Sequence, residues 1–351
     1  MLAPVLHILP LTTIQRKRLL PVPGVLHARL NQRLSAGDVV AEARWAREHL
    51  LIDVARKLGV SPATADRLIV CKEGDELIAN SLIAMTRGPF PRQVRAPRDG
   101  RVVVAGGGRV LLEVGEVNLV LRAGLPGQVI EVIPDRGVVI QTAGALIQGV
   151  WGNGRIESGV LFNLMDAPDT VLRPDRLDVS LRGMVILGGI VHDAETLNTA
   201  AELPVRGLIL SSLNPPLLPL ALQMRYPILV TDGFGHIPMN SAAYRLLSTN
   251  VKREASVNAE STDRFSGARP EVIIPLPVAI EPVPPADVIA FAEGQQVRLR
   301  AGTRYGAIGS IVRLYEEAVS LPSGLRAPAA EVRLETNEEL LVPLANLEVV
   351  G

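Results

Sequence analysis

Hydrophobic and polar residues alternate at residues 297–299 near the end of the chain, and a second strand-like run contains Ile311 and Arg313. Alternation with a period of two is typical of a half-buried β-strand. Gly306 and Gly309 lie between the two runs. Glycine allows positive φ angles and close approach of neighbouring strands. The pattern therefore predicts a strand–loop–strand unit.

This unit resembles a KOW motif, and residues 288–351 resemble the small SH3-like β barrel that carries such motifs. The resemblance implies contact with RNA, with a polymerase or with another protein. Arg298, Arg300 and Arg304 around Tyr305 are candidates to grip and stack on a single strand. The segment as a whole holds more acidic than basic residues, which is the wrong sign for affinity driven by phosphates. RNA is therefore the weaker of the expected partners.

The first third of the chain contains a faint internal repeat. Residues 25–41 align with residues 68–84, each unit reading as strand, tight polar turn and short strand. Asn31-Gln32 and Gly74-Asp75 are placed at matching turns by this alignment, and both pairs are of types that favour turns. Residues 94–104 complete the pattern as a third strand-forming segment.

The combination resembles the biotinyl/lipoyl-like barrel-sandwich hybrid, over residues 21–43 and 67–116. In carrier members of that fold a Lys at a hairpin tip is modified. Here the tip is residues 85–92, which contain no Lys. We therefore expect no covalent biotin or lipoate, and a structural or binding role for a domain spanning residues 1–116.

A helical insertion is predicted at about residues 46–68. Leu50, Val54 and Leu58 recur at helical spacing, and Gly59 reads as a helix stop. Ser61 followed by proline is typical of a new helix start. Two interpretations are open: a helical hairpin inserted between the halves of a barrel, or a DNA-binding helix-turn-helix. The flanking strands and mixed charges favour the hairpin.

Residues 117–165 are predicted to be β-rich. Trp151 lies there between Val150 and Gly152, with a second glycine at 149. A tryptophan among glycines indicates either a binding surface or a side chain that covers the edge of a small barrel. We retain Trp151 as a candidate partner-binding residue.

Short apolar runs alternate with helical patterns in residues 170–275, which predicts a central α/β domain with a largely parallel sheet. Strands are expected at 184–187, 207–210 and 227–231, and helices at 194–203 and 238–247. Several prolines in residues 276–287 predict a stiff linker to the terminal barrel.

Ligands of open α/β sheets bind at the carboxyl ends of the strands. Two of these ends are rich in glycine and polar residues and could cradle an anion. The candidate ligand-binding residues are Gly188, Gly189, Asp193, Asp232, Gly233, Gly235 and His236. Neither end matches a dinucleotide or phosphate-loop motif, and no zinc spacing or nucleophile motif is present. We therefore predict no cofactor, no metal and no assigned catalytic residue.

The charges balance at 36 basic and 36 acidic residues, so no overall field draws the chain to nucleic acid or to a membrane. The single cysteine, Cys71, excludes an intrachain disulfide and is typical of a cytoplasmic protein. No apolar run is long enough and free enough of proline and charge to predict a membrane span.

The order of domains resembles a bacterial multi-domain family of uncharacterised activity that combines a lipoyl-like barrel-sandwich with a KOW-type SH3-like domain. The sequence predicts a non-enzymatic binding or scaffold protein whose KOW-type module contacts a protein or a ribonucleoprotein, such as the ribosome or the transcription machinery. The alternative is a small-molecule-binding protein or enzyme that uses the Gly-rich ends of the α/β strands.

Overall fold

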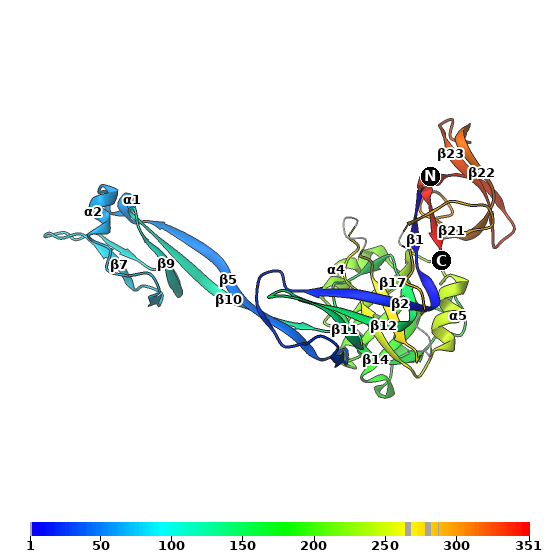
Figure 1. The fold of residues 1–351 in the computed structure, drawn as a ribbon, viewed down its shortest axis with the longest axis horizontal. Coiled ribbons are helices and arrows are strands. Elements are labelled where there is room, and N and C mark those ends of the chain that lie inside the picture. The colour runs from blue at the N-terminus through cyan, green and yellow to red at the C-terminus, as the bar shows by residue number, and fades with distance from the viewer. Residues whose placement is uncertain (1, 264–267, 278–281, 287) are drawn as a thin grey trace.

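The computed structural model describes residues 2–263, 268–277, 282–286 and 288–351. Strands account for 49% of the chain and helices for 14%, and the strands form several sheets. Figure 1 shows a central body, a lobe at the end of a long two-stranded ribbon, and a C-terminal unit that contains both chain ends. The prediction of a β-rich chain with several sheets is confirmed.

A large mixed sheet, here called the central sheet, forms the central body. Its strands in the described residues are, in order, β13 (Trp151–Gly152), β17 (Ile228–Phe234), β16 (Gly207–Leu213), β15 (Met184–Val191), β14 (Ile156–Asn163), β18 (Glu254–Asn258), β19 (Glu271–Pro275), β12 (Gly137–Gln148), β11 (Gly127–Ile133) and β4 (Arg33–Leu34), with β2 (Ile8–Leu19) also paired to β12. The run β14–β15–β16–β17 is parallel. The sequence predicts the last three of these strands, whereas β14 lies in the segment that was expected to be separate.

Strands β15, β16 and β17 are buried on both faces, which is why they read as nearly continuous apolar runs. One face packs with α5 (Ser241–Thr249) and the β12, β18 and β19 strands. The other packs with α3 (Ala194–Glu202) and α4 (Leu218–Gln223). Three short 3-10 turns also belong to the body: η1 (Pro174–Arg176), η2 (Val179–Leu181) and η3 (Pro215–Leu217).

Side-chain caps fix where the two longer helices begin. Asp193 caps α3 by accepting the backbone N–H of Thr196 at 2.8 Å, so the helix begins at the predicted residue. Asn240 caps α5 in the same way, accepting from the N–H of Ala243 at 2.8 Å. The predicted start of α5 at residue 238 is therefore three residues too early, because the capping side chain at 240 was not recognised.

The predicted domain boundaries differ from the structure in the body. Residues 117–165 do not form a separate segment, since β11, β12 and β14 are strands of the same sheet as residues 184–275. The long strand β2 also belongs to this sheet and pairs with β12. Residues far apart in sequence thus form one sheet, which a linear division of the chain could not show.

A two-stranded ribbon leaves the body and carries a small distal lobe (Figure 1). The ribbon consists of β5 (Val39–Asp53) and β10 (Arg109–Arg122), which pair antiparallel along most of their length. We call residues 50–114 the distal lobe. The remaining strands of the ribbon sheet are β3 (Val25–Leu26), β9 (Gly100–Gly106) and β6 (Glu76–Leu77). The lobe also contains a hairpin of β7 (Leu82–Met85) and β8 (Gln93–Arg95).

The predicted helical insertion is shorter than expected. Residues 46–53 belong to strand β5, and only α1 (Val54–Leu58) and α2 (Pro62–Asp66) are helical. Gly59 ends α1 with a left-handed φ of 70°, and Ser61 caps α2, as predicted. The spacing of Leu50 was misleading, because a strand and a helix can each place an apolar residue four positions before Val54.

A helix-turn-helix is inconsistent with this lobe. Each of the two helices has five residues, and Val54 and Leu58 are buried in the lobe core. That core also holds Cys71, Ile83 and Leu112. Burial raises the pKa of the Cys71 thiol, as expected for a small buried hydrophobic residue rather than a nucleophile.

The two units of the predicted internal repeat share turn types, but not in the predicted alignment. Asn31 and Asn80 both have left-handed φ angles, and each donates its backbone N–H to a neighbouring segment at 2.8 Å. Asp38 and Asp75 each accept the N–H three residues earlier at 2.8 Å. The predicted match of residues 31–32 with residues 74–75 is therefore wrong, because the Asn turn comes first in one unit and the Asp turn first in the other.

The C-terminal unit is built from both ends of the chain. Its sheet in the described residues has the order β20 (Val288–Ala290), β1 (Leu2–Leu6), β25 (Leu347–Val350), β21 (Gln296–Leu299), β22 (Ile308–Ser320), β23 (Arg326–Leu334) and β24 (Glu339–Pro343). A 3-10 turn, η4 (Leu344–Asn346), precedes β25. Strand β1 pairs parallel to β25, so the predicted first domain, residues 1–116, does not stand alone.

The Pro-rich linker is only partly described, since residues 278–281 and 287 lie outside the described residues. The described part contacts the body: Thr12 donates its hydroxyl to the carbonyl of Val283 at 3.1 Å, and Thr13 donates to that of Pro282. The segment therefore runs against β2.

Candidate functional site

Two histidines meet at the carboxyl edge of the parallel strands. His192 follows β15, and His236 follows β17. Nε2 of His192 lies 2.9 Å from Nδ1 of His236, with the ring planes 7° apart. One ring donates and the other accepts in this contact, so at least one ring is a neutral acceptor. The sequence indicates His236 as a candidate but does not predict that the fold pairs it with His192.

The Gly188-Gly189 pair does not form an anion-binding loop. Both residues are buried inside strand β15, not beyond its end. A Cβ on Gly188 would lie 2.7 Å from Leu172 Cδ2, and one on Gly189 would strike the carbonyl of Thr170. Gly189 also has a φ of 78°. These glycines let residues 170–172 pack against the strand, a close approach that the sequence alone did not distinguish from a ligand site.

The polar residues of the predicted ligand site are also used internally. Asp193 accepts both the backbone N–H and the hydroxyl of Thr196 at 2.8 Å, so its carboxylate caps α3. Ser212 donates to the carbonyl of Gly235 at 3.0 Å and accepts the N–H of Ile237 at 3.1 Å, which fixes the turn after β17. Asp193 and Gly235 therefore stabilise structure at this edge.

Asp232 is fully buried and cannot reach a ligand. Its carboxylate accepts the hydroxyl of Thr231 at 2.6 Å and the amide of Asn240 at 2.9 Å. Burial raises the pKa of Asp232, and the two hydrogen bonds and the nearby Arg298 charge offset only part of that effect. The prediction of Asp232 as a ligand-binding residue is wrong, because a strand end inside two packed units is not accessible.

Arg298 is the residue that packs against Asp232, and it is not available to nucleic acid. It lies on β21 directly opposite Glu348 of β25, and these side chains are 2% and 1% exposed. Arg298 donates from Nη1 to Glu348 at 2.8 Å and from Nη2 to the backbone carbonyl of Asp232. Arg269 of the body donates to the same carboxylate at 3.1 Å. A buried charge network therefore joins the C-terminal unit to the body.

A pocket of about 700 Å³ opens beside this network, between the body and the C-terminal unit. His236 and Asn240 line it from the body, and Arg304 and Tyr305 line it from the C-terminal unit. A Cβ on Gly233 would lie 2.8 Å from the Tyr305 ring, so this glycine permits the two units to meet. The fold thus brings His236 of the predicted ligand site together with Arg304 and Tyr305 of the predicted partner site in a single pocket.

The other predicted partner-binding residues have ordinary structural contacts. Arg304 pairs with Glu338 at 2.9 Å, and Arg300, half exposed, lies 3.9 Å from Glu348. Trp151 pairs with β17 at the edge of the central sheet and meets Phe234 edge-on at 6.1 Å between ring centroids. These contacts favour the interpretation in which Trp151 covers a strand edge. The edge belongs to the central sheet and not to a small barrel.

Sequence reasoning missed the most exposed aromatic residue of the chain's described part. Phe90 is 92% exposed at the tip of the β7–β8 hairpin, between Pro89 and Pro91. The signal was a phenylalanine flanked by two prolines in a chain that is only 3% aromatic.

Within the described ranges, no cluster of three or more His, Cys, Asp or Glu side chains is positioned to hold a metal ion. The His192–His236 pair offers two ring nitrogens only. The helices in that same part of the chain are all too short or too polar to cross a membrane.

Comparison with known proteins adds no assignment. No protein-family model matches the chain, and no curated protein matches it significantly.

Proposed function

We propose that this chain is a non-enzymatic binding or scaffold protein that engages a protein or ribonucleoprotein partner through modules at its two extremities. The observation that carries the proposal is the β7–β8 hairpin. It lies in the lobe, at the far end of the ribbon from the body (Figure 1), and presents Phe90 almost fully to solvent. Large exposed apolar side chains usually mark an interaction surface when they are grouped.

The lobe holds four further exposed apolar side chains. Leu51, Val70, Ile78 and Val104 are each more than half exposed there. The hairpin segment, residues 82–98, contains four arginines and no acidic residue. Arginine and aromatic residues are enriched at the centres of protein interfaces. A partner with an acidic, partly apolar surface fits this hairpin by its charge and by the exposed Phe90.

The KOW-type assignment of residues 288–351 belongs to the same proposal. Strands β21 to β24 form an antiparallel meander, and β25 returns after a 3-10 turn to pair with β21. This order supports an SH3-like barrel. Its exposed tip carries Leu325, which is 68% exposed between β22 and β23. Likewise, the turns at Asp75 and Asn80 support a lipoyl-like unit within the distal lobe alone. The predicted single barrel-sandwich over residues 21–43 and 67–116 does not form, because residues 28–43 pack in the core of the body and residues 71–114 pack in the core of the lobe.

The test is capture of partners by the tagged full chain from the cells that produce it. Phe90→Ser, Leu325→Ser and the control Val179→Ser are compared, with and without nuclease. Val179 is 76% exposed on the body, so it matches the loss of exposed apolar area without touching either module. We expect one set of partners to be lost with Phe90→Ser and kept with Val179→Ser.

The outcomes separate the versions of the proposal. Loss with Leu325→Ser alone would assign contact to the KOW-type unit, and loss on nuclease treatment would identify a ribonucleoprotein. Capture that is insensitive to both module variants, or no enriched partner, would overturn the proposal.

A second function is favoured by the pocket between the body and the C-terminal unit. Pockets between packed units are common sites for small ligands, and this one joins His236 to Tyr305. The chain would then bind a small molecule through the carboxyl edge of its parallel strands. Nucleotides and aromatic metabolites that raise the melting temperature of the wild type, but not of His236→Ala, would support it. His49→Ala is the control, because His49 is an exposed histidine on the distant ribbon.

A further inference from the structure

A second pocket lies at the opposite, amino edge of the parallel strands. It has a volume of about 750 Å³ and is formed by the segments that lead into β15, β16 and β17. Val205, Met224 and Tyr226 are buried residues among those that line it. It is separate from the partner modules and from the pocket beside His236.

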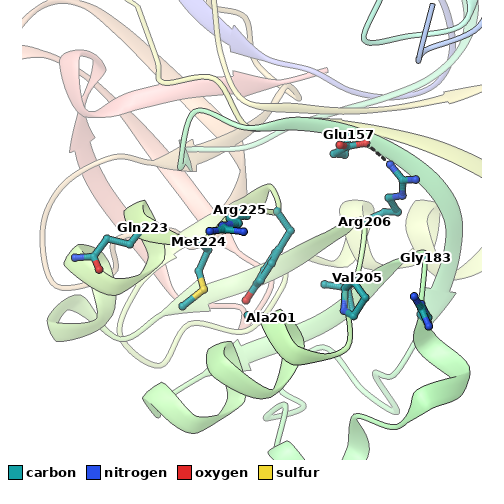
Figure 2. Close-up of a pocket in the computed structure, with 11 residues that line it drawn as sticks. Glu157, Gly183, Ala201, Val205, Arg206, Gln223, Met224 and Arg225 are labelled. Atoms are coloured by element: carbon teal, nitrogen blue, oxygen red, sulfur yellow. Dashed lines mark hydrogen bonds and ion pairs between the residues drawn. The ribbon is translucent and has the colours of Figure 1, made fainter.

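Three arginines surround this pocket, one from each of the three strand entries: Arg182, Arg206 and Arg225. Glu157 is the single acidic residue that lines it, and it pairs with Arg206 at 2.8 Å. Figure 2 shows this ion pair at one end of the row of labelled side chains and Gln223 at the other. The pocket therefore carries excess positive charge over an apolar floor.

Helix α4 ends at this edge, and unsatisfied carbonyls at a helix end attract cations. The carbonyl of Ala221 in the last turn of α4 accepts the amide of Asn153 at 3.1 Å, so a neutral side chain serves it. The hydroxyl of Tyr226 is also used inside the body, since it donates to the carbonyl of Leu197 at 2.8 Å.

Two of the three guanidinium groups are unused in the described structure. Arg182 and Arg225 are exposed, and neither side chain has a hydrogen bond or ion pair among the described residues. Guanidinium groups bind carboxylates and phosphates through two parallel hydrogen bonds. Since each is placed at the end of a packed strand, their backbone positions are fixed before any ligand binds.

We infer that this pocket binds a small organic anion, with a carboxylate or phosphate head held by Arg182 and Arg225 and an apolar body placed over Val205 and Met224. The inference does not depend on the proposed partner-binding function. A ligand of this class would regulate or be carried by the central body without contact with the distal lobe.

The test is titration of the full chain with phenyl phosphate and with 3-phenylpropionate, followed by ligand-observed NMR or calorimetry. Benzylamine has a similar apolar body and the opposite charge, and inorganic phosphate lacks the apolar body. We expect binding of at least one organic anion, weaker binding of inorganic phosphate, and none of benzylamine. Comparison of the two anions shows whether the head group is phosphate or carboxylate.

Single variants assign the site. Arg182→Gln and Arg225→Gln should each lower the affinity for the organic anion about tenfold, which is the loss typical of one charge-assisted hydrogen bond. Arg173→Gln is the control, because Arg173 is exposed on the same body and does not line the pocket. Unchanged melting of the variants shows that they remain folded. Equal weakening by Arg173→Gln, equal binding of benzylamine, or no binding at millimolar probe would overturn the inference.

Discussion

The distal lobe and the C-terminal unit are both small β-modules attached to the central body, but they are attached in different ways. The C-terminal unit shares a buried charge network with the body, where Arg298 on β21 reaches the backbone of Asp232. The lobe is connected by the ribbon of β5 and β10 alone in the described residues, and it exposes Phe90 at its far end. The first module is fixed in position, and the second projects.

This difference reverses the assignment that charge and motif suggested. The sequence placed the binding surface on the arginines of the C-terminal unit, yet the central one, Arg298, is buried as an internal anchor. Arginine in a strand pattern can face a solvent groove or a packed neighbour, and sequence cannot distinguish them. The lobe lacks the Lys of a carrier domain, but its hairpin is the more accessible element, with Phe90 92% exposed. Attachment therefore decides which module is free to bind.

The largest effect is expected where the C-terminal unit is anchored. Glu348→Ala removes the carboxylate that neutralises Arg298 and Arg269, and leaves Arg298 buried without its partner. Loss of one member of a buried pair costs about 3–5 kcal/mol, so the free energy of unfolding should fall by that amount in urea titrations. Glu339→Ala removes an exposed carboxylate paired with Arg333, and should cost less than about 1 kcal/mol. Equal losses would show that the anchor is not the buried pair.

A substitution in the core of the lobe should show that the lobe unfolds independently of the C-terminal unit. Ile83 is fully buried in the lobe, and Ile83→Ala should destabilise it by about 2–5 kcal/mol. Because the ribbon is its sole connection in the described structure, hydrogen exchange should accelerate in residues 50–114 while the C-terminal unit stays protected. Ile78→Ala is the matched control, since Ile78 is 73% exposed. Faster exchange throughout the chain would contradict independent unfolding of the lobe.

The smallest effect concerns the pH dependence at the anchored junction. Burial raises the folded-state pKa of Asp232 above its unfolded value near 4, so the free energy of unfolding falls as pH rises from there through the folded pKa. Asp232→Asn can keep both hydrogen bonds, since the Thr231 hydroxyl can donate to Leu210 instead and accept from the new amide. The free energy of unfolding of the variant should equal that of the wild type at acidic pH and should be larger at neutral pH.

Urea unfolding at several pH values measures this difference. Asp178→Asn is the opposite control, because hydrogen bonds from Ser180 lower the pKa of Asp178. Its wild-type contribution is present above the unfolded pKa and is lost as pH falls. If both variants changed the pH dependence of the free energy of unfolding in the same direction, the effect could not be assigned to the raised pKa of Asp232.

The ends of helices and the positions of the buried parallel strands could be predicted from the sequence alone. Asp193, Gly59 and Ser61 end or begin helices where their side chains or backbone freedom require it, and three parallel strands follow from continuous apolar runs. Such features depend on neighbours within a few residues, so one sequence is enough to predict them. The burial of Cys71 was also predictable, from its apolar surroundings.

Everything that depends on which distant segments meet was decided by the tertiary structure. Pairing of β1 with β25, of β2 with β12, and of His192 with His236 joins residues separated by long stretches of chain. The same packing buries Arg298 and Asp232 and leaves Phe90 exposed. Residue type sets what a side chain can bind, but burial decides whether it is used inside the protein or offered to a partner.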